Sequence, residues 1–232
     1  LRALKMHGGA PLKACAEPDA DSLRRGIEHL ERHLETARLF GLEPIVAINA
    51  FPNDTEEELL LLERATAALG VRLARSEGFS RGGAGAIDLA RTVAEVVDAT
   101  DAAPPQPRYA YELTDPPAEK IRKVSRLVYG ARDIILTSAA EKSIERAVAL
   151  GAGELPVCIA KTQLSLTDDP AIAGRPRDFT ITVRDVRLSA GAGFLVPITG
   201  DMMTMPGLPK APASKGIHLL PDGRIKGLMQ ND

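Results

Sequence analysis

Two polar turns of this chain each carry one phenylalanine. Phe51 follows the apolar run 43–49 (EPIVAIN), which is typical of a strand covered on both faces. Phe79 lies in a second turn, 75–85 (RSEGFSRGGAG), which follows a short predicted strand. The carboxyl ends of parallel strands meet at one edge of a sheet, where open α/β proteins bind ligands. The two rings are therefore candidates for holding a flat ligand, although Phe51 is equally consistent with a lid on the helix that follows.

The stretch LRALKMHGG at the start of the chain holds the best isolated acid–base candidate. His7 lies beside two glycines, in what we expect to be a turn at the end of a strand, and Lys5 is a further candidate nearby. An imidazole changes its protonation state near neutral pH, so His7 could transfer protons. No nucleophile–His–carboxylate set and no carboxylate pair at catalytic spacing accompanies it. A structural role is the commoner outcome for a lone histidine.

Two further loops have the composition of ion-binding loops. Gly82, Gly83 and Gly85 precede a predicted helix, whose unpaired N–H groups could bind an anion, but the GxxxxGK[ST] pattern is absent. Asp168 and Asp169 could bind a divalent cation, although Asp-Asp-Pro more often begins a turn. Ordinary turns are the favoured interpretation of both loops, and no metal site is predicted.

The composition excludes several classes of protein. The 232 residues are 44% hydrophobic and 26% charged, as in globular proteins, and the net charge of -2 gives no reason to invoke nucleic acid or a membrane surface. Only 3% of the residues are aromatic, and no apolar run is long enough to cross a membrane. Cys15 and Cys158 are far apart and are expected to be free thiols, which favours a cytoplasmic protein.

The first part of the chain alternates helices and strands. Apolar spacing predicts a helix over 21–40, and a capping box at Thr55 predicts another over 59–69. A short strand over 71–74 and a helix over 86–97 follow. The Pro-rich stretch 99–108 is the clearest linker. We therefore expect residues 1–105 to be the C-terminal part of an α/β domain with a parallel sheet.

A smaller α/β domain with mixed strands is expected over 106–232. Its predicted helices begin at caps on Asp115 and Ser138. Its predicted strands are 132–136, 155–160, 179–186 and 194–198. Three methionines near the end of the chain, Met202, Met203 and Met205, are expected to pack against other apolar side chains. Pro221-Asp222-Gly223 is expected to form a turn.

Five stretches of the chain carry a family resemblance. They are LRALKMHGG, VAINAFPNDTEEEL, SEGFSRGGAG, CIAKTQLSLTDDP and FTITVRDVRLSAGAGFLVPITGDMMTMPGLPK, in this order over essentially the whole chain. The sequence resembles the carboxyl-terminal part of formate–tetrahydrofolate ligases. The resemblance implies that the first domain is the end of a P-loop-type domain and that Leu1 falls well inside the family's chain, so we expect a fragment.

The resemblance also implies a chemistry. Family members join formate to tetrahydrofolate with MgATP, through formyl phosphate, and hold the pterin between two aromatic side chains that match Phe51 and Phe79. The second position usually carries Trp in the family. Asn49 and Pro52 are then further candidates for folate binding. The resemblance places adenine contacts in this half of the protein, at the following candidates: Arg75, Ser76, Glu77 and Gly174.

Further expectations rest on the resemblance alone. The phosphate-binding loop and the residues that hold formyl phosphate lie upstream in the family, so this chain by itself is expected to be inactive. A homotetramer and activation by a monovalent cation are also implied.

Two other classes of protein are alternatives to this interpretation. Asn49 after an apolar strand is reminiscent of the NKxD turn of GTPases, but Ala50 and Pro52 stand where that motif needs Lys and Asp. The second alternative is a non-catalytic, degenerate half kept for oligomerisation or for binding a partner.

Overall fold

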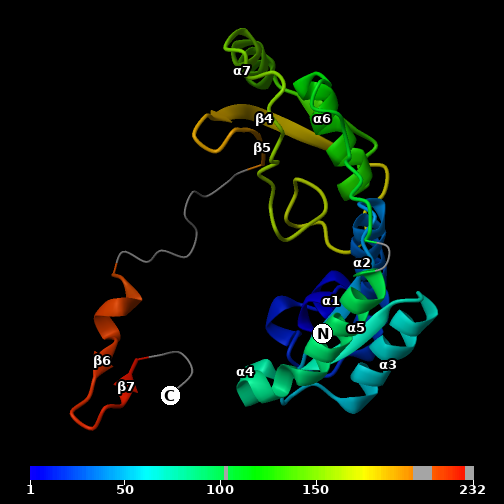
Figure 1. Cartoon of the computed structure of the whole chain (residues 1–232), viewed down its shortest axis with the longest axis vertical. Helices are drawn as coiled ribbons and strands as arrows, with labels where there is room; N and C mark the ends of the chain where they lie inside the picture. Colours follow the sequence, from blue (N-terminus) through cyan, green and yellow to red (C-terminus); the bar gives the residue numbers. More distant parts are fainter. Residues whose placement is uncertain (102–103, 201–210, 228–232) are drawn as a thin grey trace. The chain divides into compact units, whose positions relative to one another are not determined.

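A computed structural model describes residues 1–101, 104–200 and 211–227. The chain divides into two compact units, Leu1–Gly200 and Asp201–Asp232, which are described separately (Figure 1). The first unit has an α/β fold with one parallel and one mixed sheet. This agrees with the predicted fold class, whereas the division near residue 105 stays a prediction.

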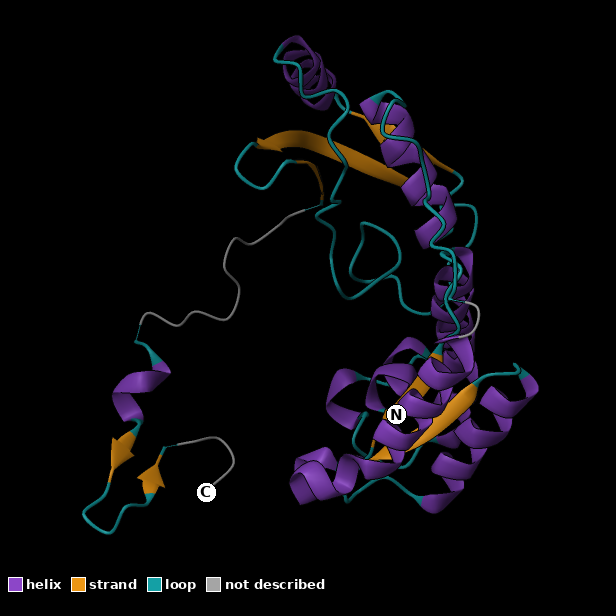
Figure 2. Ribbon diagram, in the orientation of Figure 1, coloured by secondary structure: helices purple, strands orange, loops and turns teal. Residues whose placement is uncertain are grey.

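The parallel sheet holds the two phenylalanine turns. Strand β1 (Ile45–Asn49) pairs with β2 (Arg72–Ser76) in parallel, with Asn49 opposite Ser76 at the carboxyl end (Figure 2). The helices of this region are α2 (Ala20–Leu39), α3 (Glu56–Ala68), α4 (Gly78–Arg81) and α5 (Ile87–Asp101), and the 3-10 segment η2 (Gly82–Ala86) precedes α5. The predicted parallel arrangement is therefore confirmed.

Side-chain caps fix where the long helices begin. Asp19 accepts a hydrogen bond from the Ser22 amide at the start of α2. Thr55 and Glu58 form the predicted capping box of α3, with Thr55 Oγ1 accepting from the Glu58 amide and the Glu58 carboxylate accepting from the Thr55 amide. Because α3 starts directly after the Phe51 turn, this cap also limits the length of that turn.

The first residues form a helix, which corrects our expectation of a strand end. Helix α1 (Arg2–His7) packs on α2, and the short 3-10 segment η1 (Leu12–Ala14) follows it. Two glycines permit backbone contact between the helices. A Cβ atom on Gly8 would lie 1.7 Å from the Ser22 carbonyl oxygen, and one on Gly26 would lie 1.9 Å from the Leu4 carbonyl oxygen. Any larger side chain would force α1 away from α2.

The hydrophobic core has separate clusters beside the two sheets. Near β1 and β2, buried residues of α2 and α3 pack against buried residues in or next to the strands. One cluster contains Leu34, Val46 and Val71, and another contains Ile48, Leu59 and Leu62. Around the second sheet a larger cluster contains Ile121, Ile134, Ala140, Ala147, Ala152, Val183, Val186 and Leu195.

The second sheet is mixed, as predicted. Strand β3 (Asp133–Leu136) is parallel to β4 (Thr180–Ser189), which is antiparallel to β5 (Phe194–Thr199). Its helical elements are α6 (Pro117–Val124), the π-helical turn η3 (Ser125–Tyr129) and α7 (Ser138–Ala149). The predicted strand 155–160 runs parallel to β5, with bridges at Val157 and Ala160. Backbone hydrogen bonds join the two, among them those from the Cys158 amide to the Leu195 carbonyl oxygen and from the Ala160 amide to the Pro197 carbonyl oxygen.

Two predicted helix caps were wrong. The cap of α7 is Thr137, whose side chain accepts from the Ala140 amide, one residue before Ser138. The cap position of α6 is Pro116, because the Asp115 carboxylate bonds Lys123 instead.

The second unit is described over 211–227 only. A 3-10 turn, η4 (Ala213–Gly216), leads to a small hairpin of β6 (His218–Leu219) and β7 (Ile225–Lys226), with Pro221-Asp222-Gly223 at its predicted turn. The predicted packing methionines, Met202, Met203 and Met205, lie outside the described residues. In the described ranges no helix is both long and apolar enough to cross a membrane.

Candidate functional site

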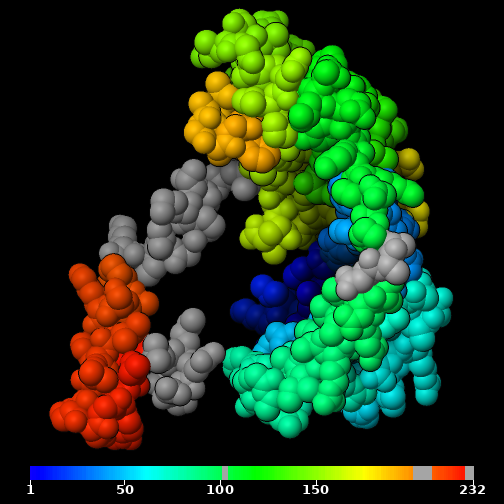
Figure 3. Space-filling model, in the orientation of Figure 1, coloured from blue at the N-terminus to red at the C-terminus, as the bar shows by residue number. Residues whose placement is uncertain are grey.

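Phe51 and Phe79 lie in contact at the carboxyl end of the parallel sheet. Their ring centroids are 5.4 Å apart and their planes meet at 51°. The Ala50 amide donates to the Ser76 carbonyl oxygen over 2.9 Å, which joins the chain just after β1 to the end of β2. Phe79 is 62% exposed, and the segment from α4 into α5 lies at the surface of the first unit (Figure 3). We call these two residues the phenylalanine pair.

The phenylalanine pair does not leave room for a third ring between its members. A flat ring held between two others needs a centroid separation of about 7 Å, which is two layers at van der Waals contact. The observed 5.4 Å is the distance of a tilted pair in direct contact. Binding between the rings therefore requires them to separate. Phe79 is the better candidate for movement, because it is exposed and lies on a helix of only four residues.

A polar cavity of about 610 Å³ adjoins Phe51. Its walls come from the Phe51 turn, the start of α3, the end of β2 and the α4–α5 region. The charged residues that line it are Asp54, Glu56, Arg75, Glu77, Arg81, Asp88 and Arg91. Its size suits a small organic ligand, and its walls offer both donors and acceptors.

Asp54 fixes the conformation of the Phe51 turn. Its Oδ2 accepts a hydrogen bond from the Phe51 amide over 2.9 Å, and its own amide donates to the Phe51 carbonyl oxygen over 3.0 Å. Pro52 lies between them and restricts the backbone further. The sequence interpretation did not include Asp54. The Pro-Asn-Asp composition favours a turn, but it does not predict a side chain that accepts from an amide three residues before it.

Arg2 of α1 also reaches the phenylalanine pair. Its guanidinium lies 4.2 Å from the centre of the Phe51 ring, within the range of a cation–π interaction. Helix α1 thus places a positive charge beside the site, which the sequence interpretation also missed.

Arg75, Ser76 and Glu77 lie at the end of β2, next to the phenylalanine pair. Arg75 is held by Glu56 and Glu63, with N–O distances of 2.8 and 2.7 Å. The hydrogen bonds that its guanidinium donates to these two carboxylates raise the pKa of Arg75 above the usual value. The Glu77 carboxylate is paired with Arg81 over 2.7 Å. These ion pairs line the cavity and would have to rearrange for either side chain to bind a nucleotide directly.

Gly174 lies elsewhere, against the histidines of α1 and α2. Its amide donates to His7 Nδ1 over 3.2 Å, and its carbonyl oxygen is 2.9 Å from His29 Nδ1. The rings of His7 and His29 are stacked with centroids 3.5 Å apart, and His33 Nε2 lies 3.0 Å from His29 Nε2. We call His7, His29 and His33 the histidine cluster. Both backbone polar groups of Gly174 are thus engaged by this cluster.

These contacts determine the protonation of His7. Burial, followed by the neighbouring His29 and His33, lowers the pKa of His7 to about 4. Burial also lowers the pKa values of His29 and His33. His7 is therefore neutral at physiological pH, and its Nδ1 accepts a bond from the backbone. The geometry favours the structural role of this histidine.

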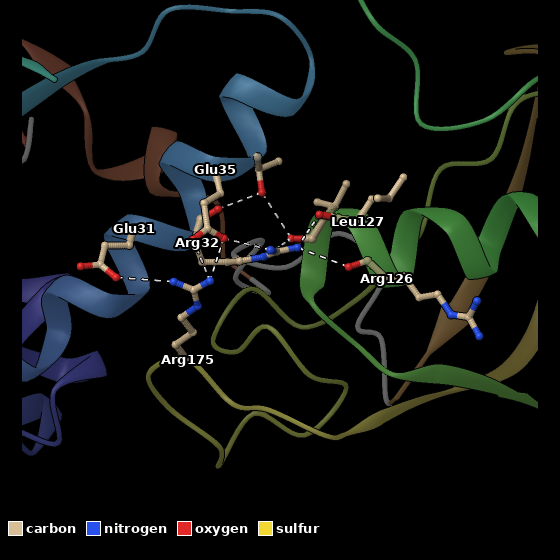
Figure 4. A network of polar contacts seen from close by, with 8 residues as sticks. Glu31, Arg32, Glu35, Arg126, Leu127 and Arg175 are labelled. Carbon is tan, nitrogen blue, oxygen red and sulfur yellow. Dashed lines mark hydrogen bonds and ion pairs between the residues drawn. The ribbon is translucent and has the colours of Figure 1, made fainter. Parts of the chain in front are cut away.

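Helix α2 also forms polar contacts with the loop after Gly174 and with the end of η3 (Figure 4). Arg175 pairs with Glu35 over 2.7 Å and with Glu31 over 3.5 Å. Arg32 of α2 donates to the carbonyl oxygens of Val128 and of the two residues before it, at the end of η3. A positive charge at a helical C-terminus is favourable. Helix α2 therefore connects the parallel sheet to the elements of the second sheet.

Lys5 is buried and is not available to a ligand. Its ammonium donates to Glu58 Oε1 over 3.0 Å and to the Glu17 carbonyl oxygen over 2.8 Å. Both side chains of the ion pair are almost fully buried. Lys5 thus connects α1 to the start of α3 and so to the Phe51 turn.

The two candidate ion-binding loops are held by contacts within the protein. Asp168 Oδ2 accepts from the Thr182 amide and Asp169 Oδ1 accepts from the Ala171 amide. A Cβ atom on Gly85 would lie 2.5 Å from the Glu77 carbonyl oxygen, so this glycine permits a tight turn. Across the described ranges no group of three or more His, Cys, Asp or Glu side chains is arranged to hold a metal ion.

Comparison with known proteins agrees with the sequence resemblance. A protein-family model described as formate–tetrahydrofolate ligase matches residues 1–229. A curated relative from Myxococcus xanthus (strain DK1622), named formate–tetrahydrofolate ligase, is 53% identical over all 232 residues of the chain. The chain spans 42% of the length of that relative. With a family model matched over nearly its entire length, this chain belongs to the formate–tetrahydrofolate ligase family.

Proposed function

We propose that this chain supplies the tetrahydrofolate site of an ATP-dependent ligase that joins formate to tetrahydrofolate. The observation that carries the proposal is the phenylalanine pair, two rings on adjacent strand-to-helix turns that meet at 5.4 Å beside a cavity of about 610 Å³. Family membership supplies the class of ligand, because the relative is named for formate and tetrahydrofolate. A pterin is a flat ring of the kind that two aromatic faces hold well.

In this proposal Phe51 and Phe79 separate and stack on the two faces of the pterin. Asp54 and Pro52 hold the Phe51 turn in place, and Asn49 at the end of β1 contacts the ligand from the sheet edge. Phe79 offers less area than an indole and lacks its N–H donor, so folate binding is expected to be weaker than with Trp at this position.

The nucleotide is proposed to bind with the adenine near Arg75, Ser76 and Glu77. The closeness of these residues to the phenylalanine pair supports this placement. Gly174 also remains a candidate for contact with the adenine, but only through its backbone surface, because both its polar groups bond histidines.

The chain alone is expected not to catalyse the reaction. Its 232 residues contain no GxxxxGK[ST] motif, and phosphoryl transfer depends on such a loop with its Lys and on Mg²⁺. The P-loop type of the first domain, a homotetramer, a monovalent cation and a cytoplasmic location are proposals that family membership supports. None of them is assigned to particular residues.

Calorimetric titration of the chain tests this function. We expect saturable binding of tetrahydrofolate. In a separate titration we expect little or no binding of MgATP, because these residues contain no phosphate-binding loop to complete the nucleotide site. Absence of tetrahydrofolate binding by the folded chain would contradict the proposal that the site is contained in these residues. The candidates would then be a folate site that needs further parts of the ligase to assemble, and a non-catalytic module for oligomerisation or partner binding.

A further inference from the structure

One oxygen of the Asp54 carboxylate has no partner. Oδ2 accepts from the Phe51 amide, whereas Oδ1 is buried and accepts no hydrogen bond within the described residues. A buried acceptor without a donor is unfavourable, because it has lost water and gained nothing in exchange. Such atoms are rare in folded proteins and call for an explanation.

The surroundings of Asp54 suggest a ligand as the missing partner. Asp54 lines the cavity of about 610 Å³ together with Phe51 and Pro52. The hydrogen bond from the Phe51 amide to Asp54 Oδ2 holds the carboxylate in the same turn as the Phe51 ring. Arg2 lies over that ring but forms no ion pair with Asp54 among the described contacts. The Leu1 ammonium interacts electrostatically with Asp54 but donates no hydrogen bond to Oδ1. The oxygen without a hydrogen bond therefore belongs to a residue that lines the cavity beside Phe51.

We propose that Asp54 Oδ1 recognises an N–H donor on the edge of the flat ring held by Phe51 and Phe79. The inference rests on the proposed function, in which that ring is a pterin. The pterin edge carries a 2-amino group and an adjacent ring N–H, both of which donate. A carboxylate accepts such bonds in a charge-assisted form. Separation of the two rings uncovers Oδ1 as the ligand enters, so that Asp54 becomes a specificity-determining residue.

A purely structural role for Asp54 makes a different prediction. Such a role needs only the bond from the Phe51 amide, which an asparagine can also accept. In Asp54→Asn the side-chain carbonyl oxygen must face the backbone N–H of Phe51. The opposite orientation would place the side-chain NH₂, a second donor, against that N–H. The NH₂ group then replaces Oδ1, and the variant keeps the turn but presents a donor to the ligand.

The test measures the binding of two ligands to two proteins, the unmodified protein and Asp54→Asn. Each protein is the full-length polypeptide that contains this chain. Affinities for tetrahydrofolate and for its 2-desamino analogue are measured by calorimetry. We expect Asp54→Asn to lose roughly tenfold or more in affinity for tetrahydrofolate, since a polar group is left without its partner. We also expect the unmodified protein to discriminate against the analogue and the variant to discriminate much less. Thermal unfolding of both proteins checks that the variant is folded.

Three outcomes overturn the inference. The first is equal tetrahydrofolate affinity in Asp54→Asn and in the unmodified protein. The second is an equal loss for both ligands, which would assign Asp54 to positioning alone. The third, which needs no variant, is equal affinity of the unmodified protein for the two ligands. Failure of the proposed function is distinguishable from all three, because the unmodified protein would then bind no tetrahydrofolate.

Discussion

The ammonium of Lys5 lies 3.0 Å from Glu58 Oε1, and the two side chains are 0% and 1% exposed. The same carboxylate accepts from the Asp19 amide over 2.8 Å and from Thr55 at the start of α3. One buried carboxylate therefore joins α1, the start of α2 and the cap that follows the Phe51 turn. The phenylalanine pair depends on this arrangement, because both Arg2 and the Phe51 turn are positioned through it.

Removal of one partner from this buried pair is expected to destabilise the protein strongly. Lys5→Met leaves the Glu58 carboxylate buried without its cation, which typically costs about 3 to 5 kcal/mol. Urea unfolding of the variant and of the parent chain measures the difference. Arg24→Met is the matched control, because the Arg24–Asp21 pair is 57% and 80% exposed and such pairs contribute about 0 to 1 kcal/mol. Similar losses in the two variants would contradict this role of Lys5.

The crossing of α1 over α2 is expected to tolerate no side chain at Gly26. Gly26→Ala places a Cβ atom 1.9 Å from the Leu4 carbonyl oxygen, a backbone atom that can move only with its helix. The clash outweighs the helix propensity gained from alanine, so the expected loss is about 2 kcal/mol or more in unfolding free energy. Gly83→Ala is the control, since its Cβ atom meets nothing within 4 Å. A Gly26→Ala protein as stable as Gly83→Ala would show that the helices do not cross in this way.

Stability is expected to fall in mild acid because of the histidine cluster. The pKa of His7 is lowered from 6.5 to about 4 in the folded protein. Between these values the unfolded chain binds the proton and the folded chain does not, so the unfolding free energy decreases as pH falls from about 6.5 to about 4. Above pH 6.5 both states are neutral at this group and its contribution is constant.

Unfolding by urea at pH 7.5, 5.5 and 4.0 measures this dependence. His7→Gln is expected to flatten the curve relative to the parent chain. His218→Gln serves as the control, because His218 is an exposed residue of the hairpin in the second unit. The interpretation is wrong if the two variants show the same pH dependence.

A larger ring at position 79 is expected to strengthen ligand binding. Phe79→Trp adds stacking area and an N–H donor on an exposed side chain, so it should fit without repacking the core. We expect a several-fold gain in tetrahydrofolate affinity, measured by calorimetry on the full-length protein. Phe194→Trp, on β5 and also exposed, is a control for the general effect of an added indole. An unchanged or weaker affinity in Phe79→Trp would indicate that this ring does not contact the pterin.

Local sequence signals were enough to predict the parallel sheet and the position of its two turns. The apolar run before Asn49, the capping box at Thr55 and the glycines near Phe79 each act over a few residues. They predicted where strands end and helices begin. Once two strands are parallel, the closeness of Phe51 and Phe79 follows from the geometry of the sheet.

The remainder of the site depends on contacts between distant parts of the chain. Lys5 and Glu58 meet only because Gly8 and Gly26 allow α1 to pack closely on α2. The strand expectation for the first residues was wrong because the run RALKMH consists mainly of good helix formers. No side-chain cap marks the start of this helix, so the usual local signal for a helix start was missing. Gly174 reaches His7 across more than 160 residues of sequence, and no local pattern predicts that contact.

The central claim is tested most directly by the tetrahydrofolate affinity of Phe51→Ala in the full-length protein. Loss of one stacking face typically costs about 1 to 3 kcal/mol, which corresponds to roughly a 5- to 150-fold weaker affinity. Leu12→Ala, which truncates an exposed side chain on η1, is the control and is expected to bind as the parent protein does. Tetrahydrofolate affinity that is unchanged in a folded Phe51→Ala protein would contradict the proposal that the phenylalanine pair holds the pterin.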